Sequence, residues 1–221
     1  MRASHVILKV EQLDRAVREY RERGFAVEYG RRRNPINALI YFSEGPYLEL
    51  LDGTRMPAAV KAFMRVIGKK ALSDRLQRLD NCEPGYCELA LENYKDNLDE
   101  EIAILKKHGI ESYGMPSRRV DTHGRDLRFR LAVPKALDVP FLMTYFSIDP
   151  KPANFVHPNG IREISRVSYG TDPSRFAVIE ELCDDERLKL TTGRGIEVEF
   201  GREGAQDRKS TRLNSSHGRR S

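Results

Sequence analysis

The sequence has no run of apolar residues long enough to cross a membrane. A membrane-spanning helix needs about 20 largely apolar residues, and no window of the chain holds even roughly 18 of them. The opening MRASHVILKV leads straight into a predicted strand and lacks the charged and then apolar layout of a secretory signal. We therefore expect a globular protein that stays in the cytoplasm and does not bind a membrane.

Cysteine is scarce: the chain has only Cys82, Cys87 and Cys183, and no Cys-x-x-Cys pair. An odd number of cysteines without such a pair is typical of reduced thiols. A dinucleotide-binding fingerprint is also absent, because the glycines at 193 and 195 in TTGRGIEVEF are typical of a turn. The chain has no nucleophile-elbow motif either. Any chemistry must therefore be sought in individual side chains.

The net charge of +5 comes mostly from residues 201–221, which hold six basic and two acidic residues. The rest of the chain is nearly neutral, and we do not expect it to bind nucleic acid. The segment 202–221 is rich in Ser, Arg and Gly and has no periodic apolar face, which predicts disorder. Because DRKSTRLNSSH resembles translated adapter or vector sequence, we regard this tail as non-native and leave it out of the fold prediction.

One pattern of predicted secondary structure occurs twice and begins a third time. Within residues 1–52 it opens with the strand HVILKV, continues with the helix LDRAVREYRERGF and ends with apolar runs up to YLELL. Residues 83–150 repeat it from GYCELAL through NLDEEIAILKKHGI to PFLMTYF. Residues 151–201 hold a third, incomplete unit of one strand, one helix and two strands, so we expect the natural chain to continue beyond it. Residues 53–82 are predicted to form a helical insert between the first two units.

Periodicity places the elements and also assigns side chains to faces. Besides the strand GYCELAL, predicted strands cover residues 4–10, 25–30, 37–43, 46–51, 111–115, 126–132, 140–146, 163–169, 187–191 and 195–200. Predicted helices cover residues 12–23, 94–108 and 173–183. Alternation along a strand puts His5 on one face with Ile7, and Glu49 on one face with Tyr47. In the second helix, Tyr94 is expected to begin the inward apolar stripe.

This order of elements resembles the module of the vicinal oxygen chelate superfamily. HVILKVEQLDRAVREYRERGF, followed by NALIYF and YLELL, is similar to its glyoxalase-like branch, and the resemblance continues through GRDLRFRLAVP, VPFLMTYF and HPNGIREISRV. It covers roughly residues 4–200. The resemblance implies an α+β fold in which repeated βαβββ modules form a curved mixed β-sheet around a cavity, as in glyoxalase, bleomycin-resistance and dihydroxybiphenyl dioxygenase proteins.

In that superfamily a metal, where one is bound, is held by side chains of the first and last strands of each module. The resemblance places His5 and Glu49 at those positions of the first module, as candidate metal ligands and candidate catalytic residues. Imidazole and carboxylate groups are suitable ligands for Zn, Fe, Mn or Ni. The alternative is a metal-free pair of the two residues, which could still work as an acid–base dyad.

The second module departs from the pattern, so the implied ligand set is incomplete. The position that matches the histidine falls near residues 86–88, and the position that matches the carboxylate falls at Met143 or Thr144. Glu88 can bind a metal, whereas Met143 and Thr144 are poor ligands for zinc or iron. We list Glu88 and Thr144 as candidate substrate-binding residues.

His157 in the sequence HPNG is a further candidate for substrate binding. It either reaches the cavity or belongs to a turn, because His-Pro-Asn-Gly is a turn sequence in its own right. Aromatic residues expected near the cavity are Tyr41, Tyr47, Phe141 and Tyr145. Tyr47 is the one predicted to contact substrate, although aromatic side chains on strands are more often part of the core.

Two functions follow from these expectations. The first is an enzyme that acts on a small organic metabolite through metal or acid–base chemistry at His5 and Glu49, as a lyase, isomerase or dioxygenase. The second is a metal-free protein that binds and sequesters a small molecule, as bleomycin-resistance proteins do. The incomplete ligand set favours binding, and the His5–Glu49 pair favours catalysis. The expected partner is a small-molecule ligand, and a homodimer is one possible assembly.

Overall fold

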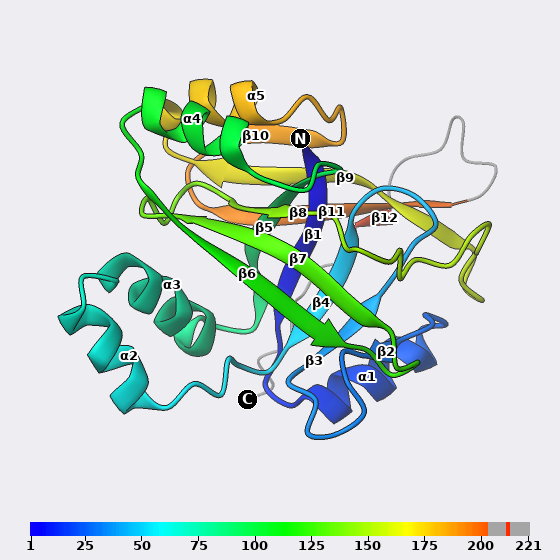
Figure 1. Cartoon of the computed structure of the whole chain (residues 1–221). Coiled ribbons are helices and arrows are strands. Elements are labelled where there is room, and N and C mark those ends of the chain that lie inside the picture. Colours follow the sequence, from blue (N-terminus) through cyan, green and yellow to red (C-terminus); the bar gives the residue numbers. More distant parts are fainter. Residues whose placement is uncertain (203–210, 213–221) are drawn as a thin grey trace, which may run out of the picture.

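Two βαβββ modules build most of the molecule (Figure 1). The computed structural model describes residues 1–202 and 211–212. The elements of the first module are β1 (Arg2–Lys9), α1 (Leu13–Glu22), β2 (Glu28–Tyr29), β3 (Asn37–Ile40) and β4 (Tyr47–Leu51). The elements of the second module are β5 (Gly85–Asn93), α4 (Asp99–Lys107), β6 (Ser112–Val120), β7 (Asp126–Pro134) and β8 (Phe141–Thr144). The predicted α+β fold of repeated modules is confirmed.

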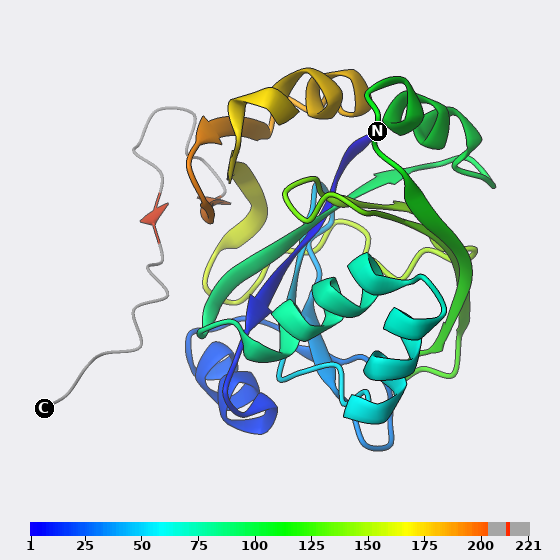
Figure 2. The same cartoon turned by 90° about the vertical axis from the view of Figure 1, so that its left-hand side faces the viewer.

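The two modules share one mixed sheet with the strand order β2-β3-β4-β1-β5-β8-β7-β6. In each module the first and last strands are parallel neighbours, β1 with β4 and β5 with β8. The two first strands, β1 and β5, pair antiparallel in the middle of the sheet. The modules are therefore related by an approximate two-fold axis between these strands. The sheet is strongly curled (Figure 2), and the cavity described below lies on its concave face.

The helical insert packs against this concave face. It consists of α2 (Ala58–Val66) and α3 (Lys70–Asn81). Leu79 of α3 packs with Ile7 of β1 and Leu51 of β4, and Figure 2 shows the two helices at the hollow of the sheet. The insert therefore covers part of the face on which the site is built.

Polar contacts hold α3 in this position. The guanidinium group of buried Arg75 donates to three backbone carbonyl oxygens at the end of β7 and in the loop that follows it. Arg75 and Arg78 also form ion pairs with Glu88 of β5, at 3.0 and 2.6 Å. Glu88 is fully buried, so these two guanidinium groups supply the countercharge that a buried carboxylate requires.

A third unit covers the other face of the large sheet. Its elements are β9 (Ile161–Thr171), a 3-10 turn (Pro173–Arg175), α5 (Phe176–Leu182), β10 (Leu188–Thr192), β11 (Gly195–Arg202) and β12 (Thr211–Arg212). They form a second sheet with the order β10-β9-β11-β12. Ile164, Val167 and Phe200 of this sheet share one buried cluster with Val6 and Leu8 of β1. The main core therefore lies between the two sheets, on the opposite side of β1 from Ile7.

The local sequence explains both limits of α1 and the end of α4, where Gly109 has a φ of +71°, but not the start of α4. In α1 the apolar stripe of Leu13, Val17 and Tyr20 is buried, and Gly24 follows the helix with a φ of +79°. The inward position predicted for Tyr94 is wrong, because its side chain is 64% exposed. The second helix begins only at Asp99, and Tyr94 still belongs to the connection after β5.

Within the described residues, no helix is long and apolar enough to cross a membrane. Most of the predicted tail, 202–221, lies outside the described residues. In the part that is described, Arg202 is the last residue of β11, and Thr211–Arg212 pair with the same strand as β12. The domain boundaries that the repeat suggested stay a prediction.

Candidate functional site

The concave face of the large sheet encloses a cavity with a volume of about 230 Å³. Every strand of the two modules except β2 and β5 contributes to its wall, and α3 adds Leu79. Its lining is mostly apolar, with a few polar side chains. The polar ones are His5, Asn37, Tyr47, Glu49, Ser117 and Arg119. A mostly apolar concavity with a few convergent polar groups is the usual form of a small-molecule site.

His5 and Glu49 lie side by side in this cavity, as the sequence predicted. Nε2 of His5 is 3.5 Å from Oε2 of Glu49. The parallel pairing of β1 with β4 brings them together, because Glu49 stands opposite Ile7, two residues along β1 from His5 and on the same face. The other carboxylate oxygen of Glu49 accepts a hydrogen bond of 2.8 Å from the side-chain amide of Asn37.

Aromatic rings hold the imidazole of His5 in one orientation. Tyr47 stacks on it with a centroid distance of 4.6 Å and an interplanar angle of 17°. Phe141 meets it edge-on at 5.5 Å. Because His5 is only 4% exposed, the ring has little freedom to turn, and Nε2 stays directed at Glu49.

A hydrogen-bond chain behind His5 sets its tautomer. The hydroxyl of Ser4 donates to Oε2 of Glu92 at 2.6 Å. Oγ of Ser4 also lies 3.1 Å from Nδ1 of His5. Since the single hydroxyl hydrogen of Ser4 is used by Glu92, Nδ1 must be the nitrogen that donates. Nε2 is then the nitrogen with the free lone pair, and it faces the cavity.

A β-bulge makes this chain possible. The register between β1 and β5 shifts between Ala3 and His5, so Ser4 is an extra residue on β1. In a regular strand Ser4 and His5 would point to opposite faces, whereas a bulge can direct two successive side chains to the same side. Glu92, the last member of this hydrogen-bond chain, is fully buried and forms an ion pair with Arg2 at 2.7 Å.

Burial disfavours the charged form of both members of the His5–Glu49 pair. Burial lowers the pKa of His5 to about 3, and the positive charges of Arg119 and Lys151 act in the same direction. Burial also raises the pKa of Glu49, against the opposing effects of the Asn37 hydrogen bond and of Arg119. A neutral imidazole beside a carboxyl group that holds its proton more tightly than usual can exchange a proton with a ligand.

Arg119 of β6 brings a positive charge to the cavity. Its guanidinium donates a 2.7 Å hydrogen bond to the hydroxyl of Tyr41 and lies over the ring of Phe146 at 5.5 Å. Alternation along β6 separates it from Arg118, which is paired with Asp126 and lines a groove outside the cavity. Arg119 forms no ion pair within the described residues, and it acts on the site through its charge, which lowers the pKa of both His5 and Glu49.

The donor set does not fit a divalent metal. In the first module His5 pairs with Tyr47, the first residue of β4. In the second module Ala90 pairs with Phe141, the first residue of β8, so Ala90 is the equivalent of His5. By the same register Met143 occupies the position of Glu49 in the second module. Ala90 has no donor atom. Across residues 1–202 and 211–212, no three His, Cys, Asp or Glu side chains come together as a metal site, and a catalytic zinc site needs three protein ligands.

The match for the His5 position is therefore Ala90, not a residue within 86–88. The physical reason is a second register shift between β1 and β5, at Ile7 and Leu8. It displaces the start of β5 relative to the simple spacing of the sequence. The expectation that Met143 or Thr144 matches Glu49 agrees with the register, with Met143 as the residue.

A comparison with protein families agrees with this architecture, since the model of the glyoxalase-like domain matches residues 4–182. The chain belongs to the glyoxalase-like domain family, within the vicinal oxygen chelate superfamily. The resemblance read from the sequence is confirmed. No curated protein matches the chain closely enough to add a substrate or a reaction.

Of the other predicted site residues of this glyoxalase-like domain, one lines the cavity and the rest lie outside it. Tyr47 lines the cavity and stacks on His5. Glu88 does not line it, because its carboxylate is ion-paired with Arg75 and Arg78 under α3. His157 lies outside the cavity as well: its ring contacts Phe25, Phe42 and Phe155 edge-on, its Nδ1 accepts from the Ala26 amide, and its carbonyl accepts from Gly160 in a turn.

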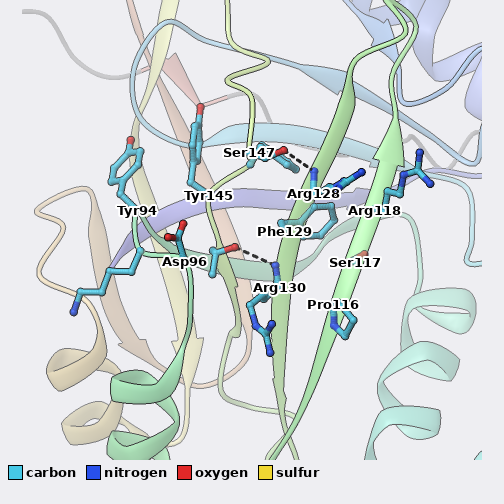
Figure 3. Close-up of a pocket in the computed structure, with 13 residues that line it drawn as sticks. Tyr94, Asp96, Pro116, Ser117, Arg118, Arg128, Phe129, Arg130, Tyr145 and Ser147 are labelled. Carbon is cyan, nitrogen blue, oxygen red and sulfur yellow. Dashed lines mark hydrogen bonds between the residues drawn. The ribbon is translucent and has the colours of Figure 1, made fainter.

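Thr144 lies at an outer groove rather than in the cavity. Figure 3 shows this groove, with Arg118, Arg130 and Tyr145 among the side chains that line it. Its hydroxyl accepts a hydrogen bond from the amide of Arg130, where β7 and β8 separate. The groove shares Ser117, Phe129 and Phe146 with the cavity, so these side chains form the wall between the two. Of the aromatic residues expected at the cavity, Phe141 lines it and Tyr145 lines this outer groove.

Sequence reasoning missed Arg119, Asn37 and the chain formed by Ser4 and Glu92. Asn37 could have been found from its position at the start of the strand beside Glu49. Ser4 is next to His5 in the sequence, but alternation argued against a contact and only the bulge allows it. Arg119 had no sequence signal, because nothing in SRRV distinguishes it from its neighbour Arg118.

Proposed function

We propose that this glyoxalase-like protein is an enzyme that moves a proton on a small organic metabolite, as an isomerase or a lyase. The observation that carries the proposal is the 3.5 Å approach of His5 Nε2 to Glu49 Oε2 inside a cavity of about 230 Å³. In this reaction the His5–Glu49 pair is the general base. The free lone pair of His5 Nε2 faces the cavity and receives the substrate hydrogen, and Glu49, whose pKa burial raises, carries the proton within the pair or returns it.

The surroundings support this division of roles. The Ser4–Glu92 chain keeps the proton of His5 on Nδ1, and Tyr47 keeps the ring in place. A base that is oriented before the substrate arrives lowers the cost of reaching the reactive geometry. The cavity is smaller than most drug-sized sites, which span about 300–1,000 Å³, and this favours a compact metabolite.

A bound divalent metal is the narrower part of the proposal. His5 and Glu49 together supply one imidazole and one carboxylate, whereas an iron-dependent dioxygenase site uses two histidines and one carboxylate. The check is metal analysis of protein purified without chelators. A full equivalent of Zn, Fe, Mn or Ni that is lost in both His5→Ala and Glu49→Gln would establish a metal site.

A binding protein is the second candidate, and the apolar lining favours it. Phe129, Leu131, Phe141, Met143 and Phe146 supply a large part of the cavity wall. Such a wall binds small apolar compounds without any reaction. Location in the cytoplasm and assembly as a homodimer stay predictions.

Proton exchange separates the two candidates. Metabolites that raise the melting temperature of the wild type are incubated with it in D₂O, and deuterium incorporation is followed by NMR. An enzyme of the proposed type exchanges a substrate proton, and His5→Asn and Glu49→Gln abolish the exchange. The matched controls are the exposed residues His123 and Glu11, as His123→Asn and Glu11→Gln. Binding without exchange in the wild type would support the sequestering protein.

A further inference from the structure

Resting on the proposed function of this cavity, we infer that its substrate is a small monocarboxylate whose carboxylate group is bound by Arg119. The inference depends on where the cavity has charge and where it has hydrogen-bond acceptors. Arg119 is the one Lys or Arg side chain among the residues that line the cavity. Its guanidinium carries five N–H donors, and Tyr41 is its hydrogen-bond acceptor in the described part of the chain.

No carboxylate of the described residues is in direct contact with the guanidinium of Arg119. Among residues 1–202 and 211–212, no carboxylate forms an ion pair with Arg119, whereas the adjacent Arg118 is paired with Asp126 at 2.5 Å. A guanidinium turned toward an apolar cavity without a counterion is unfavourable unless an anion enters with the ligand. Glu49 acts on Arg119 through its charge but forms no ion pair with it, because its carboxyl group accepts from Asn37 and is directed at His5.

Arg119 is also held in place before any ligand binds. The Tyr41 hydroxyl fixes one Nη atom at 2.7 Å, and the ring of Phe146 lies against the guanidinium plane at 5.5 Å. Tyr41 in turn packs against Tyr47, the ring that stacks on His5, with a centroid distance of 5.0 Å. The cation and the base are therefore connected through Tyr41 and Tyr47, and a ligand meets both at a fixed separation.

The positions of Arg119, His5 and Glu49 indicate which functional groups a ligand of this cavity carries. Arg119 offers donors to an anion, and His5 and Glu49 place an imidazole lone pair and a carboxyl group side by side on β1 and β4. A molecule that carries a carboxylate at one end and an O–H or acidic C–H near it satisfies both groups at once. The apolar wall and the volume of about 230 Å³ leave room for a short apolar body between or beside these groups.

A carboxylate fits better than a phosphate. A planar guanidinium pairs with a carboxylate through two parallel hydrogen bonds. A phosphate ester carries up to two negative charges, and the described lining of the cavity offers one cationic side chain to neutralise them. Lys151 influences the charge of His5 but does not line the cavity, and its ammonium donates to the carbonyl of Gly45.

The test is calorimetric titration with three matched probes: benzoate, the neutral benzamide and the dianionic phenylphosphonate. We expect the wild type to bind benzoate at least about tenfold more tightly than either of the others, because hydrogen bonds to a charged group are the stronger kind. Arg119→Gln should weaken benzoate binding about tenfold or more and leave benzamide unchanged. Arg119→Lys keeps the positive charge but loses the planar guanidinium group that forms two parallel hydrogen bonds. Its affinity for benzoate should lie between those of the wild type and Arg119→Gln. Arg118→Gln is the matched control on the same strand and should bind as the wild type does.

Three results would overturn the inference: benzoate fails to bind, benzamide or phenylphosphonate binds as well as benzoate, or Arg119→Gln and Arg119→Lys both retain the wild-type affinity for benzoate. Deuterium exchange distinguishes its failure from that of the proposed function. Exchange on a neutral metabolite that survives Arg119→Gln removes the carboxylate inference and keeps the enzyme. Benzoate binding that depends on Arg119, without exchange on any carboxylate tested, keeps the carboxylate site and removes the enzyme.

Discussion

The hydroxyl oxygen of Ser4 lies 3.1 Å from Nδ1 of His5, on the side of the ring that faces away from Glu49. Its hydrogen is given to Glu92 at 2.6 Å. The two residues are neighbours in the sequence, and a bulge in β1 brings their side chains to the same side. The contact makes Nδ1 the protonated nitrogen and leaves Nε2 free for chemistry.

Ser4→Ala should therefore change the tautomer of His5. Without the hydroxyl, Nδ1 loses its acceptor, and the two tautomers become comparable in population. We expect the ¹⁵N shifts of the His5 ring to move toward the average of the two forms and proton exchange on a substrate to fall by about tenfold or more. The control is Ser165→Ala, since Ser165 donates to the carbonyl of Glu199 away from the cavity. Unchanged ¹⁵N shifts in Ser4→Ala would show that another group sets the tautomer.

Glu49→Gln should stabilise the protein near neutral pH while it removes activity. Burial raises the pKa of Glu49 in the folded state, so the ionised form that dominates the unfolded chain at pH 7 is disfavoured by folding. That cost is absent below the unfolded pKa and appears as the pH rises through it toward the folded pKa. A glutamine still accepts from Asn37 and can donate to His5, so we expect a gain of about 1 kcal/mol at pH 7.

The measurement is the free energy of unfolding of the wild type and of Glu49→Gln at pH 4 and pH 7. The gain should be present at pH 7 and small at pH 4. A loss of stability at pH 7 would show that the ionised carboxylate is favourable in the folded state. In that case the pair with His5 would be an ion pair, and the acid–base assignment would need to be reversed.

His157 should make the protein sensitive to acid. Burial lowers its pKa to about 4 from the ordinary value of 6.5, and its Nδ1 accepts from the amide of Ala26, which requires the neutral form. Because the folded-state pKa is lowered, the stability from this group is fully present above pH 6.5 and is lost as the pH falls toward 4. Each pH unit in that window corresponds to about 1.4 kcal/mol, so the total is about 3 kcal/mol.

His157→Gln tests this directly, since its side-chain oxygen can still accept from Ala26. The variant should lose less stability than the wild type between pH 7 and pH 4, measured by urea unfolding at each pH. The exposed His123 provides the control, and His123→Asn should keep the wild-type pH dependence. Equal slopes for the wild type and His157→Gln would contradict the prediction.

The sequence predicted the parts of this molecule that depend on local periodicity. Alternation in the first strand and in YLELL was enough to place His5 and Glu49 on one face, because a regular strand has a period of two. The same rule failed for Ser4 and for Ala90, since both depend on bulges in the pairing of β1 with β5. Arg119 lies on β6, at the edge of the sheet, and faces the same cavity as β1 and β4 because the sheet is curled. That curvature depends on strands that are far apart in the sequence, so local periodicity does not reveal it.

The position of the insert was also beyond local prediction. Its amphipathic pattern indicated a helical insert, and it could not say which surface the insert covers. That surface is decided by Leu79, which packs with Ile7, and by Arg75, which reaches carbonyl oxygens about sixty residues away along the chain. Glu88 looked like a site residue for the same reason, because its two arginine partners come from the insert.

Glu88 should therefore contribute to the stability of the folded protein rather than to ligand binding. Its carboxylate is fully buried between Arg75 and Arg78, and its loss leaves the buried Arg75 without a countercharge. Removal of one partner of a buried ion pair typically costs about 3–5 kcal/mol. We expect Glu88→Gln to lower the free energy of unfolding by an amount in this range. Replacement of both buried partners, as Arg75→Met with Glu88→Leu, should cost less than the sum of the two single changes.

The measurement is chemical unfolding of Glu88→Gln and of the four proteins of the cycle, which are the wild type, Arg75→Met, Glu88→Leu and the double variant. The surface pair of Lys107 and Glu181 provides the comparison, because both side chains are accessible to solvent, and Glu181→Gln should have a far smaller effect. Benzoate affinity should be unchanged in Glu88→Gln at a temperature where the variant is folded, since Glu88 is not part of the cavity wall. If stability were unchanged and benzoate affinity fell instead, Glu88 would belong to the binding site after all, and α3 would have to move to expose it.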